Sequence, residues 1–175
     1  IGRNLTRGLG TGMNPEIGRQ AAEENRSEIA EALGGTDLIF IAAGLGGGTG
    51  TGAAPVVAEI AKQSGALTVA FVTKPFSFEG SQRDRIAQEG MIKLREKVDA
   101  LMIVPNDRIF SIISKDTPLL KAFAAIDDIL KNALSGIVEV IVSPGIINLD
   151  FADVKAIMDG AGTAVIGLGI ASGQD

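Results

Sequence analysis

Gly44-Leu45-Gly46-Gly47-Gly48-Thr49-Gly50-Thr51-Gly52 is a glycine-rich loop between an apolar run, residues 38–43, and a helical pattern that begins at Ala53. Successive glycines let backbone N–H groups converge on one point, and the positive end of the following helix favours an anion there. The hydroxyls of Thr49 and Thr51 can also donate to phosphate oxygens. A tight turn without a ligand is the alternative, but it rarely needs six glycines in nine residues. The 44–52 loop therefore predicts a phosphate-binding site.

Apolar runs and helical patterns alternate on both sides of this loop. Short apolar runs bounded by glycines are typical of strands that are covered on both faces, as parallel strands are. The alternation predicts an α/β fold with a parallel sheet in a single domain, residues 1–175. We expect strands at residues 38–43, 66–73, 100–104 and 164–168, and helices at residues 14–33, 53–62, 81–97, 117–142 with an interruption near Gly136, and 150–158.

The two ends of the sequence suggest an incomplete sheet. Residues 1–13 are loop-like, and no strand–helix–strand unit precedes the first expected helix. The chain also stops just after the last expected strand. We therefore expect an interior piece of a longer protein.

Composition excludes several kinds of chemistry. The chain has no His and no Cys, so a Ser–His–Asp triad, a zinc–thiolate site and a thiol nucleophile are all excluded. The remaining groups are carboxylates, Lys and Arg, hydroxyls, backbone amides, or a hard cation such as Mg²⁺, and these suit phosphate chemistry.

Charge and hydropathy exclude two kinds of partner. The 16 basic and 21 acidic residues are interleaved and give a net charge of −5, so we expect no nucleic-acid binding. The apolar runs are far shorter than the ~20 residues of a membrane span. We therefore expect no membrane insertion and a cytoplasmic protein.

The class of phosphate ligand is less certain from the residues alone. A Walker A loop needs a Lys after its last glycine, and none is present here. Gly48-x-Gly50-x-x-Ala53 weakly matches a dinucleotide fingerprint, but Lys74-Pro75 stands where the acid of that fingerprint is expected. A nicotinamide-dependent oxidoreductase stays open as an alternative. A second glycine loop, Gly8-Leu9-Gly10-Thr11-Gly12, precedes the first helix (together with Met13 it is called the 8–13 loop below). Two such loops at the same edge of a sheet would suit a triphosphate better than one.

Several longer motifs match one known family. This chain resembles the FtsZ family of bacterial, tubulin-like cell-division GTPases over essentially all its residues. The resemblance implies a Rossmann-like, three-layer GTPase domain that binds GTP or GDP, polymerises head to tail and hydrolyses GTP. It also implies that the family's first βαβ portion, its second domain and its flexible tail are missing here. The matching stretches are Gly8-Leu9-Gly10-Thr11-Gly12-Met13-Asn14-Pro15-Glu16, Gly46-Gly47-Gly48-Thr49-Gly50-Thr51-Gly52, Pro75-Phe76-Ser77-Phe78-Glu79-Gly80, Pro105-Asn106-Asp107 and Asn148-Leu149-Asp150-Phe151-Ala152-Asp153-Val154.

By this resemblance, Gly46–Gly52 contacts the di- and triphosphate, and Thr11, Gly12 and Met13 lie near the γ-phosphate. Relatives often carry alanine at the positions of Thr11 and Met13, so packing there could differ. Glu79 and Arg83 match residues that face the ribose and a nearby phosphate. Without the resemblance they would be an exposed i,i+4 ion pair. The phosphate residues so assigned are Thr11, Gly12, Met13, Gly46, Gly47, Gly48, Thr49, Gly50, Thr51 and Gly52.

Asn106, Phe123 and Asp127 match the family's contacts to the base. Phe123 and Asp127 are four residues apart on one expected helix, so a ring can lie on the purine while a carboxylate meets its edge. Guanine offers two adjacent donors to that carboxylate, whereas adenine has an acceptor at N1 and would be repelled. Asn106 can serve guanine O6 or N7. From the residues alone, Phe123 would be a core residue and Asp127 a solvated helix acid.

Asp150, Asp153 and Asn148 match the family's catalytic loop, where the acids would orient or polarise the attacking water. Without the resemblance, the two acids would be an N-cap and a first-turn residue. A helix from Phe123 to about Val142 would span roughly 28 Å at ~1.5 Å per residue, so Asp150 should lie far from the base. A neighbouring subunit would then supply the acids, and such heterologous contacts make a filament.

The resemblance also implies cofactors, partners and a location. We expect GTP or GDP with Mg²⁺, self-association into filaments at the division site, and membrane anchors and division regulators that bind through the absent tail. A filament-forming relative that binds GTP but barely hydrolyses it is a further alternative.

Overall fold

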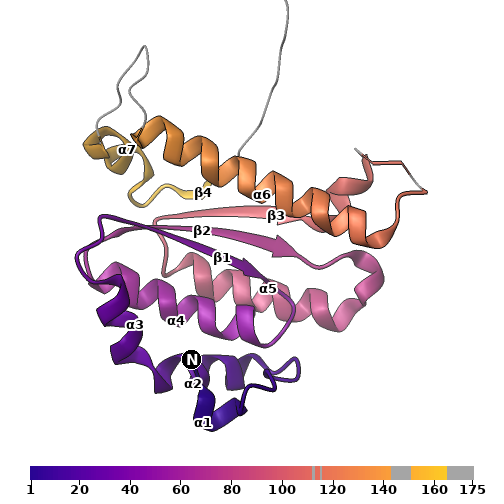
Figure 1. The fold of residues 1–175 in the computed structure, drawn as a ribbon, viewed down its shortest axis with the longest axis horizontal. Helices are drawn as coiled ribbons and strands as arrows, with labels where there is room; N and C mark the ends of the chain where they lie inside the picture. Colours follow the sequence, from indigo (N-terminus) through magenta and orange to yellow (C-terminus); the bar gives the residue numbers. More distant parts are fainter. Residues whose placement is uncertain (112, 115, 143–150, 165–175) are drawn as a thin grey trace, which may run out of the picture.

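Four parallel strands lie side by side in the order in which they occur along the chain (Figure 1). The structure, a computed structural model, describes residues 1–111, 113–114, 116–142 and 151–164. Neighbouring strands pair in parallel, with Leu38 opposite Leu67 and Val69 opposite Ala100. The strands are β1 (Leu38–Gly44), β2 (Leu67–Lys74), β3 (Ala100–Pro105) and β4 (Gly162–Ala164).

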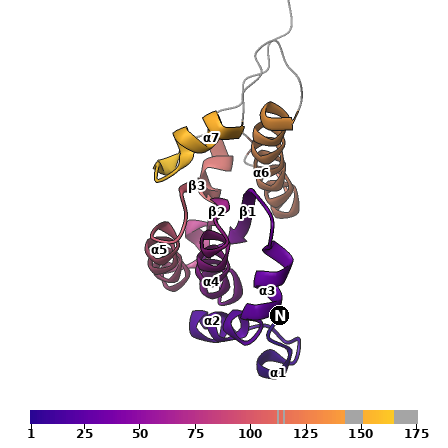
Figure 2. The same ribbon diagram turned by 90° about the vertical axis from the view of Figure 1, so that its left-hand side faces the viewer.

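Helices cover both faces of this sheet (Figure 2). One face carries α6, and the other carries α4 and α5, with α1 and α2 lying beyond α4 (Figure 1). The expected three-layer α/β architecture is therefore confirmed. The helices are α1 (Arg3–Thr6), α2 (Pro15–Glu24), α3 (Arg26–Leu33), α4 (Thr49–Gln63), α5 (Ser81–Arg95), α6 (Leu119–Val142) and α7 (Phe151–Met158), with short 3₁₀ turns η1 (Ser77–Glu79) and η2 (Asn106–Ser111).

The side chains of β2 alternate between the two helical layers, which explains the unbroken apolar run from Val69 to Val72 at its centre. Ala70 and Val72 belong to the core formed with α4 and α5. Val69 and Phe71 belong to the core formed with α6, where Leu130 packs against them. Burying each of the larger apolar side chains stabilises the fold by about 1.5–3 kcal/mol. The covered sheet holds the ends of the strands, and so the loops that follow them, in fixed positions.

The start of α2 is as expected, but its end is not. Asn14 caps the helix, since its side chain accepts a hydrogen bond from the Glu16 N–H at 3.0 Å, and Pro15 is the first helical residue. The single helix expected to Leu33 is instead broken at Asn25. The Asn25 Oδ1 accepts a hydrogen bond from the distant Gly2 N–H at 2.6 Å, which no local pattern could predict.

The remaining differences from the expected elements are largest at α4, α6 and the last strand, and most other bounds differ by one or two residues. Helix α4 starts at Thr49, inside the glycine loop, because Gly48 already has right-handed helical dihedrals. Helix α6 runs without interruption through Gly136, since one glycine costs a helix only about 1 kcal/mol. The last strand is at Gly162–Ala164, earlier than expected, and residues 165–168 lie outside the described residues.

A buried carboxylate, that of Asp99, fixes the end of the sheet at which the strands begin. Asp99 is 4% exposed, accepts a hydrogen bond from the Thr68 N–H at 2.9 Å and pairs with Lys62 at 3.0 Å. The carbonyl of Asp99 also accepts a hydrogen bond from the N–H of Gly162 at 3.0 Å. From α7, the Lys155 ammonium reaches the carbonyl of Gly65 at 3.5 Å. These contacts place α7 and β4 at the edge where the strands begin.

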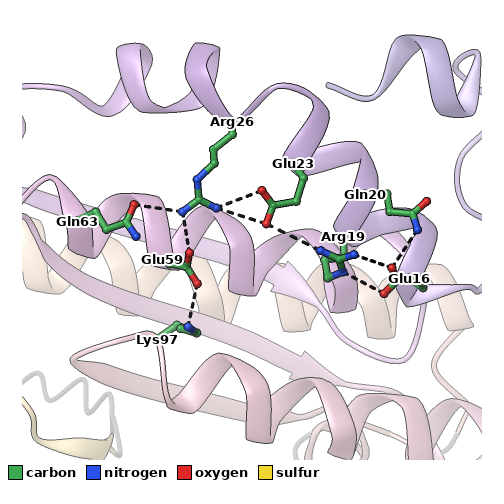
Figure 3. Close-up of polar contacts among 8 residues, drawn as sticks. All are labelled: Glu16, Arg19, Gln20, Glu23, Arg26, Glu59, Gln63 and Lys97. Carbon is green, nitrogen blue, oxygen red and sulfur yellow. Dashed lines mark hydrogen bonds and ion pairs between the residues drawn. The ribbon is translucent and has the colours of Figure 1, made fainter.

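A chain of ion pairs ties α2, α3, α4 and α5 together (Figure 3). Arg26 of α3 lies between Glu23 of α2, at 3.2 Å, and Glu59 of α4, at 2.6 Å. The second carboxylate oxygen of Glu59 pairs with Lys97, just after α5, at 2.8 Å. The hydrogen bond from Lys97 lowers the pKa of Glu59 most, and the hydrogen bond from Arg26 lowers it further.

Within the described residues, no helix has the combined length and apolar character needed to cross a membrane.

We predict that this network makes stability depend on acid pH through Glu59. Its pKa is lowered below 4.5 in the folded chain, so its contribution is present above pH 4.5 and is lost as the pH falls through the folded value. At pH 7, the unfolding temperature of full-length Glu59→Gln should therefore be lower than that of the full-length wild-type protein. This difference in unfolding temperature should narrow below about pH 4.5. The exposed Glu31→Gln is the control. A difference that stays constant down to pH 3 would contradict this role for Glu59.

Candidate functional site

The two glycine loops meet at the head of α4. The Thr11 hydroxyl of the 8–13 loop lies 3.4 Å from the Thr49 hydroxyl of the 44–52 loop, and Thr11 is only 7% exposed. A Cβ on Gly48 would lie 1.9 Å from the Thr11 hydroxyl, so the loops touch closely. The 8–13 loop therefore lies against the 44–52 loop, which follows the carboxyl end of β1.

The N-terminus of α4 is available to an anion. Its N-cap residue is Gly48, and no side chain makes a capping hydrogen bond there. The first turn of a helix has N–H groups without intrahelical acceptors, and the helix dipole adds a partial positive charge at the same place. Phosphate oxygens are well suited to such a group of donors.

Close packing accounts for several of the glycines. A Cβ on Gly52 would lie 1.9 Å from the carbonyl oxygen of Pro15, and one on Gly50 would lie 2.3 Å from that of Gly44. Gly46 has φ +96°, which side-chain-bearing residues rarely adopt. A Cβ on Gly47, in contrast, would meet nothing within 4 Å. Packing does not explain Gly47, so its open space is the natural place for a ligand to approach the backbone.

The two threonines of the loop have different surroundings. Thr49 is exposed, whereas Thr51 is 3% exposed and its hydroxyl accepts a hydrogen bond from the Gly46 N–H at 3.0 Å. Thr51 therefore braces the loop from inside, while Thr49 is the more accessible hydroxyl. The sequence alone did not distinguish them.

Gly12 and Met13 form a tight turn next to this loop. Both have positive φ, +56° and +64°, and the N–H of Asn14 donates to the carbonyl of Thr11 at 3.0 Å to close the turn. Met13 is 37% exposed. A non-glycine residue in the left-handed region costs about 1 kcal/mol or more, which the closed turn must offset.

Glu79 and Arg83 lie together after β2. Arg83 donates to one carboxylate oxygen of Glu79 at 2.9 Å, and the N–H of Phe76 donates to the other at 2.8 Å. The side chain of Glu79 is 18% exposed. The carboxylate is thus held in one orientation by a backbone group and a guanidinium, an arrangement that the i,i+4 spacing only partly predicted.

An aromatic cluster lies at the start of α6. The Phe123 ring meets the buried Phe76 edge-on at 5.2 Å, and Phe78 stacks on Phe76 at 4.8 Å. Phe123 is 40% exposed, so it is only partly a core residue. Asp127, one turn further along α6, is exposed. The ring and the carboxylate are therefore both accessible to a ligand.

Asn106, directly after β3, has an unusual environment. It is 6% exposed, and its Oδ1 is buried without a hydrogen-bond partner among the described residues. Buried polar atoms are normally paired, so this atom points to a ligand or to a group outside the described residues. The adjacent Asp107, which the sequence did not assign to the site, accepts hydrogen bonds from both the backbone N–H and the hydroxyl of Ser77. These bonds lower the pKa of Asp107.

Asp153, the predicted catalytic acid that lies within the described residues, is not close to these loops. Asp153 is exposed on α7, at the end of the molecule where the strands begin (Figure 1). The 44–52 loop follows the opposite end of β1. Asn148 and Asp150 lie outside the described residues.

Among the described residues, no three Asp or Glu side chains are grouped so that they could hold a metal ion. Mg²⁺ commonly keeps several waters and binds through the phosphates of its nucleotide together with few protein groups. The donor set here therefore fits an ion that arrives with phosphates, with the Thr49 hydroxyl available, rather than a cage of carboxylates.

Comparison with known proteins identifies similar chains. The model of the Tubulin/FtsZ family GTPase domain matches residues 1–114. Two curated relatives named "Cell division protein FtsZ", from Buchnera aphidicola subsp. Acyrthosiphon pisum (strain APS) and subsp. Schizaphis graminum (strain Sg), are 55% and 54% identical to this chain. Each match covers 100% of this chain and 46% of the relative. The chain thus spans about half the length of the curated relatives that it matches.

Solved structures agree with this similarity. "FtsZ dimer, empty" from M. jannaschii superposes with a TM-score of 0.89 at 53% identity, over 93% of this chain and 47% of that chain. A GTPgS-bound protofilament of CetZ2 from Haloferax volcanii superposes with a TM-score of 0.79 at 25% identity, over 93% of this chain and 48% of that chain. These findings disfavour the nicotinamide-dinucleotide alternative.

We predict that alanine affects stability at one glycine of the loop, Gly52, and GTP binding at another, Gly47. Gly52→Ala should lower the free energy of unfolding by about 1–3 kcal/mol, because its methyl would collide with the backbone of α2. Gly47→Ala should leave thermal unfolding nearly unchanged, because its methyl meets no atom of the chain. GTP binding should nevertheless weaken in Gly47→Ala, since the methyl occupies the space assigned to phosphate. Equal unfolding temperatures in the two variants, measured by circular dichroism, would contradict the packing account.

Proposed function

This chain belongs to the tubulin/FtsZ family, and on that premise we propose that residues 1–175 are part of the GTP-binding domain of a cell-division GTPase. The protein binds GTP or GDP, assembles head to tail into filaments of the division ring, and hydrolyses GTP where two subunits meet. The observation that carries this proposal is the meeting of the 8–13 and 44–52 loops, 3.4 Å apart at the Thr11 and Thr49 hydroxyls, over the uncapped start of α4.

The phosphates bind over this start of α4. Its free N–H groups and partial positive charge suit the β- and γ-phosphates. The exposed Thr49 hydroxyl can donate to a phosphate oxygen, while Thr51 keeps the loop in shape. The turn at Gly12 and Met13 brings the 8–13 loop against the same space, where it would contact the γ-phosphate of a triphosphate.

Guanine binds beside Phe123, Asp127 and Asn106. The half-exposed Phe123 ring offers a surface for the purine, and the exposed Asp127 carboxylate can accept from both N1–H and the exocyclic amine. The Asn106 amide has an unpaired polar atom, and the group can turn to present its NH₂ to O6 or N7. Glu79 accepts from the ribose hydroxyls, and Arg83 lies near the phosphate.

The attacking water is activated by acids of the neighbouring subunit. Asp153 lies on α7, at the end of the molecule where the strands begin, while the nucleotide binds where the strands end. Asn148 and Asp150 are assigned to the same catalytic loop by the family resemblance. A second subunit stacked head to tail brings these two ends together, and its Asp150 and Asp153 then orient and polarise the water. In support, one similar structure is described as a dimer and another as a protofilament.

Mg²⁺ supplies charge neutralisation at the phosphates when it is bound.

The protein acts in the cytoplasm at the division site. Membrane anchors and division regulators bind through a tail beyond Asp175, and neither nucleic acid nor the bilayer itself is a partner.

The test of this proposal is Asp153→Ala in the full-length protein. GTP binding, measured by calorimetry, should stay within about twofold of wild type, because Asp153 lies far from the loops that hold the nucleotide. Phosphate release should fall by a factor of about 100 or more, in line with the loss of a group that acts on the attacking water.

The matched control is Asp159→Ala, an exposed acid just beyond the other end of α7, which should leave both quantities unchanged. Normal turnover in Asp153→Ala would contradict its catalytic role. Slow turnover in the wild-type protein itself would favour a filament former that barely hydrolyses GTP, and binding of NADH in preference to GTP would favour an oxidoreductase.

A further inference from the structure

We propose that Asp107 is a positioning residue for the nucleotide site, although it does not itself contact the nucleotide; this inference rests on the proposed function. Asp107 acts by clamping the segment after β2 to the segment after β3. The two segments carry different parts of the site, so the clamp fixes the distance between the residues that hold the ribose and those that hold the base.

The clamp consists of one carboxylate and one serine. Asp107 Oδ1 accepts a hydrogen bond from the Ser77 N–H at 3.0 Å, and Oδ2 accepts another from the Ser77 hydroxyl. Both oxygens of the carboxylate are therefore engaged by one residue 30 positions away in sequence. Hydrogen bonds to an ionised group are about twice as strong as neutral ones. A lowered pKa, caused first by these bonds to Ser77 and then by the nearby Lys74, keeps the carboxylate ionised.

The clamp lies just beyond the end of the paired strands. The last paired residues of β2 and β3 are Lys74 and Pro105. Beyond them, the two segments of the chain are no longer joined by hydrogen bonds of the sheet. A hollow of about 360 Å³ lies between the segments, lined by Lys74, Pro105, Ser77 and Asp107 among others. Phe76 also packs against Ile109 and Phe110 across the two segments. Apolar packing tolerates small shifts, so losing the clamp would remove the directional contact that sets how Ser77 and Asp107 lie relative to each other.

On the β2 side, the clamp holds the residues assigned to the ribose and part of the aromatic cluster. Ser77 is the first residue of η1, which ends at Glu79. Glu79 in turn holds the Phe76 N–H and Arg83. Phe76 is 1% exposed, and its ring packs edge-on against the ring of Phe123, with the ring centroids 5.2 Å apart. Movement of Ser77 would therefore displace Glu79 and the support of the Phe123 ring together.

On the β3 side, the clamp is directly attached to Asn106. Asn106 is the first residue of η2, and its side-chain oxygen is buried with no hydrogen-bond partner among the described residues. An amide that meets a purine edge must be placed within about 0.5 Å to be useful. Asp107 supplies that placement from the next position along the chain.

The test is binding of GDP to the full-length protein by calorimetry, since GDP requires neither hydrolysis nor assembly. Asp107→Ala should raise the Kd about tenfold, equivalent to about 1.4 kcal/mol, with unchanged stoichiometry. Asp107→Asn should stay within about threefold of wild type, because its amide can accept from the Ser77 N–H and donate to the Ser77 hydroxyl. Ser77→Ala should have an intermediate effect, and combining it with Asp107→Ala should add little.

The exposed Asp37→Ala, just before β1, is the matched control and should bind GDP normally. A purely structural role would appear as a lower binding stoichiometry and a lower unfolding temperature with the Kd of the competent fraction unchanged, and that result would overturn the proposal. So would equal weakening in Asp107→Asn and Asp107→Ala, which would implicate charge rather than the clamp. A wild-type protein that binds neither GDP nor GTP would instead contradict the proposed function itself.

Discussion

The close backbone contact between α2 and α4 is the constraint on which the candidate site depends. A Cβ on Gly18 of α2 would lie 2.3 Å from the carbonyl oxygen of Gly48, and a Cβ on Gly52 of α4 would lie 1.9 Å from that of Pro15. Only glycine permits such an approach at both positions. Because α2 follows the 8–13 loop and α4 begins within the 44–52 loop, this contact is what brings the two loops together. Further along, Arg26 of α3 pairs with both Glu23 of α2 and Glu59 of α4, and so links the same two helices.

Much of the fold could be predicted from the sequence because its signals are local. The apolar run of β2 and the Asn14-Pro15 helix start are examples, and both are observed. What could not be predicted depends on partners distant in the chain. The break at Asn25 depends on Gly2, and the orientation of Thr51 depends on the packing of α4 against its neighbours.

The candidate site shows the same division. Motifs indicated the phosphate loops and the residues near the base, but not how each side chain is held. Phe123 is only partly buried because Ala122 and Ile126 occupy the inward positions of α6. The clamp between Asp107 and Ser77 joins residues 30 positions apart, so no spacing rule suggests it. The roles of these residues toward GTP stay predictions, whereas the places of those within the described residues are structural.

The central claim is that one subunit holds the nucleotide while its neighbour supplies Asp153. The sheet and α6, which is 24 residues long, separate the two ends and are too rigid to bring them together within one chain. Phosphate release per molecule of the full-length protein, measured over a wide range of protein concentration, tests this claim most directly. A shared site predicts that specific activity rises steeply with concentration and vanishes on dilution. Constant specific activity down to concentrations at which the protein is monomeric would contradict the claim.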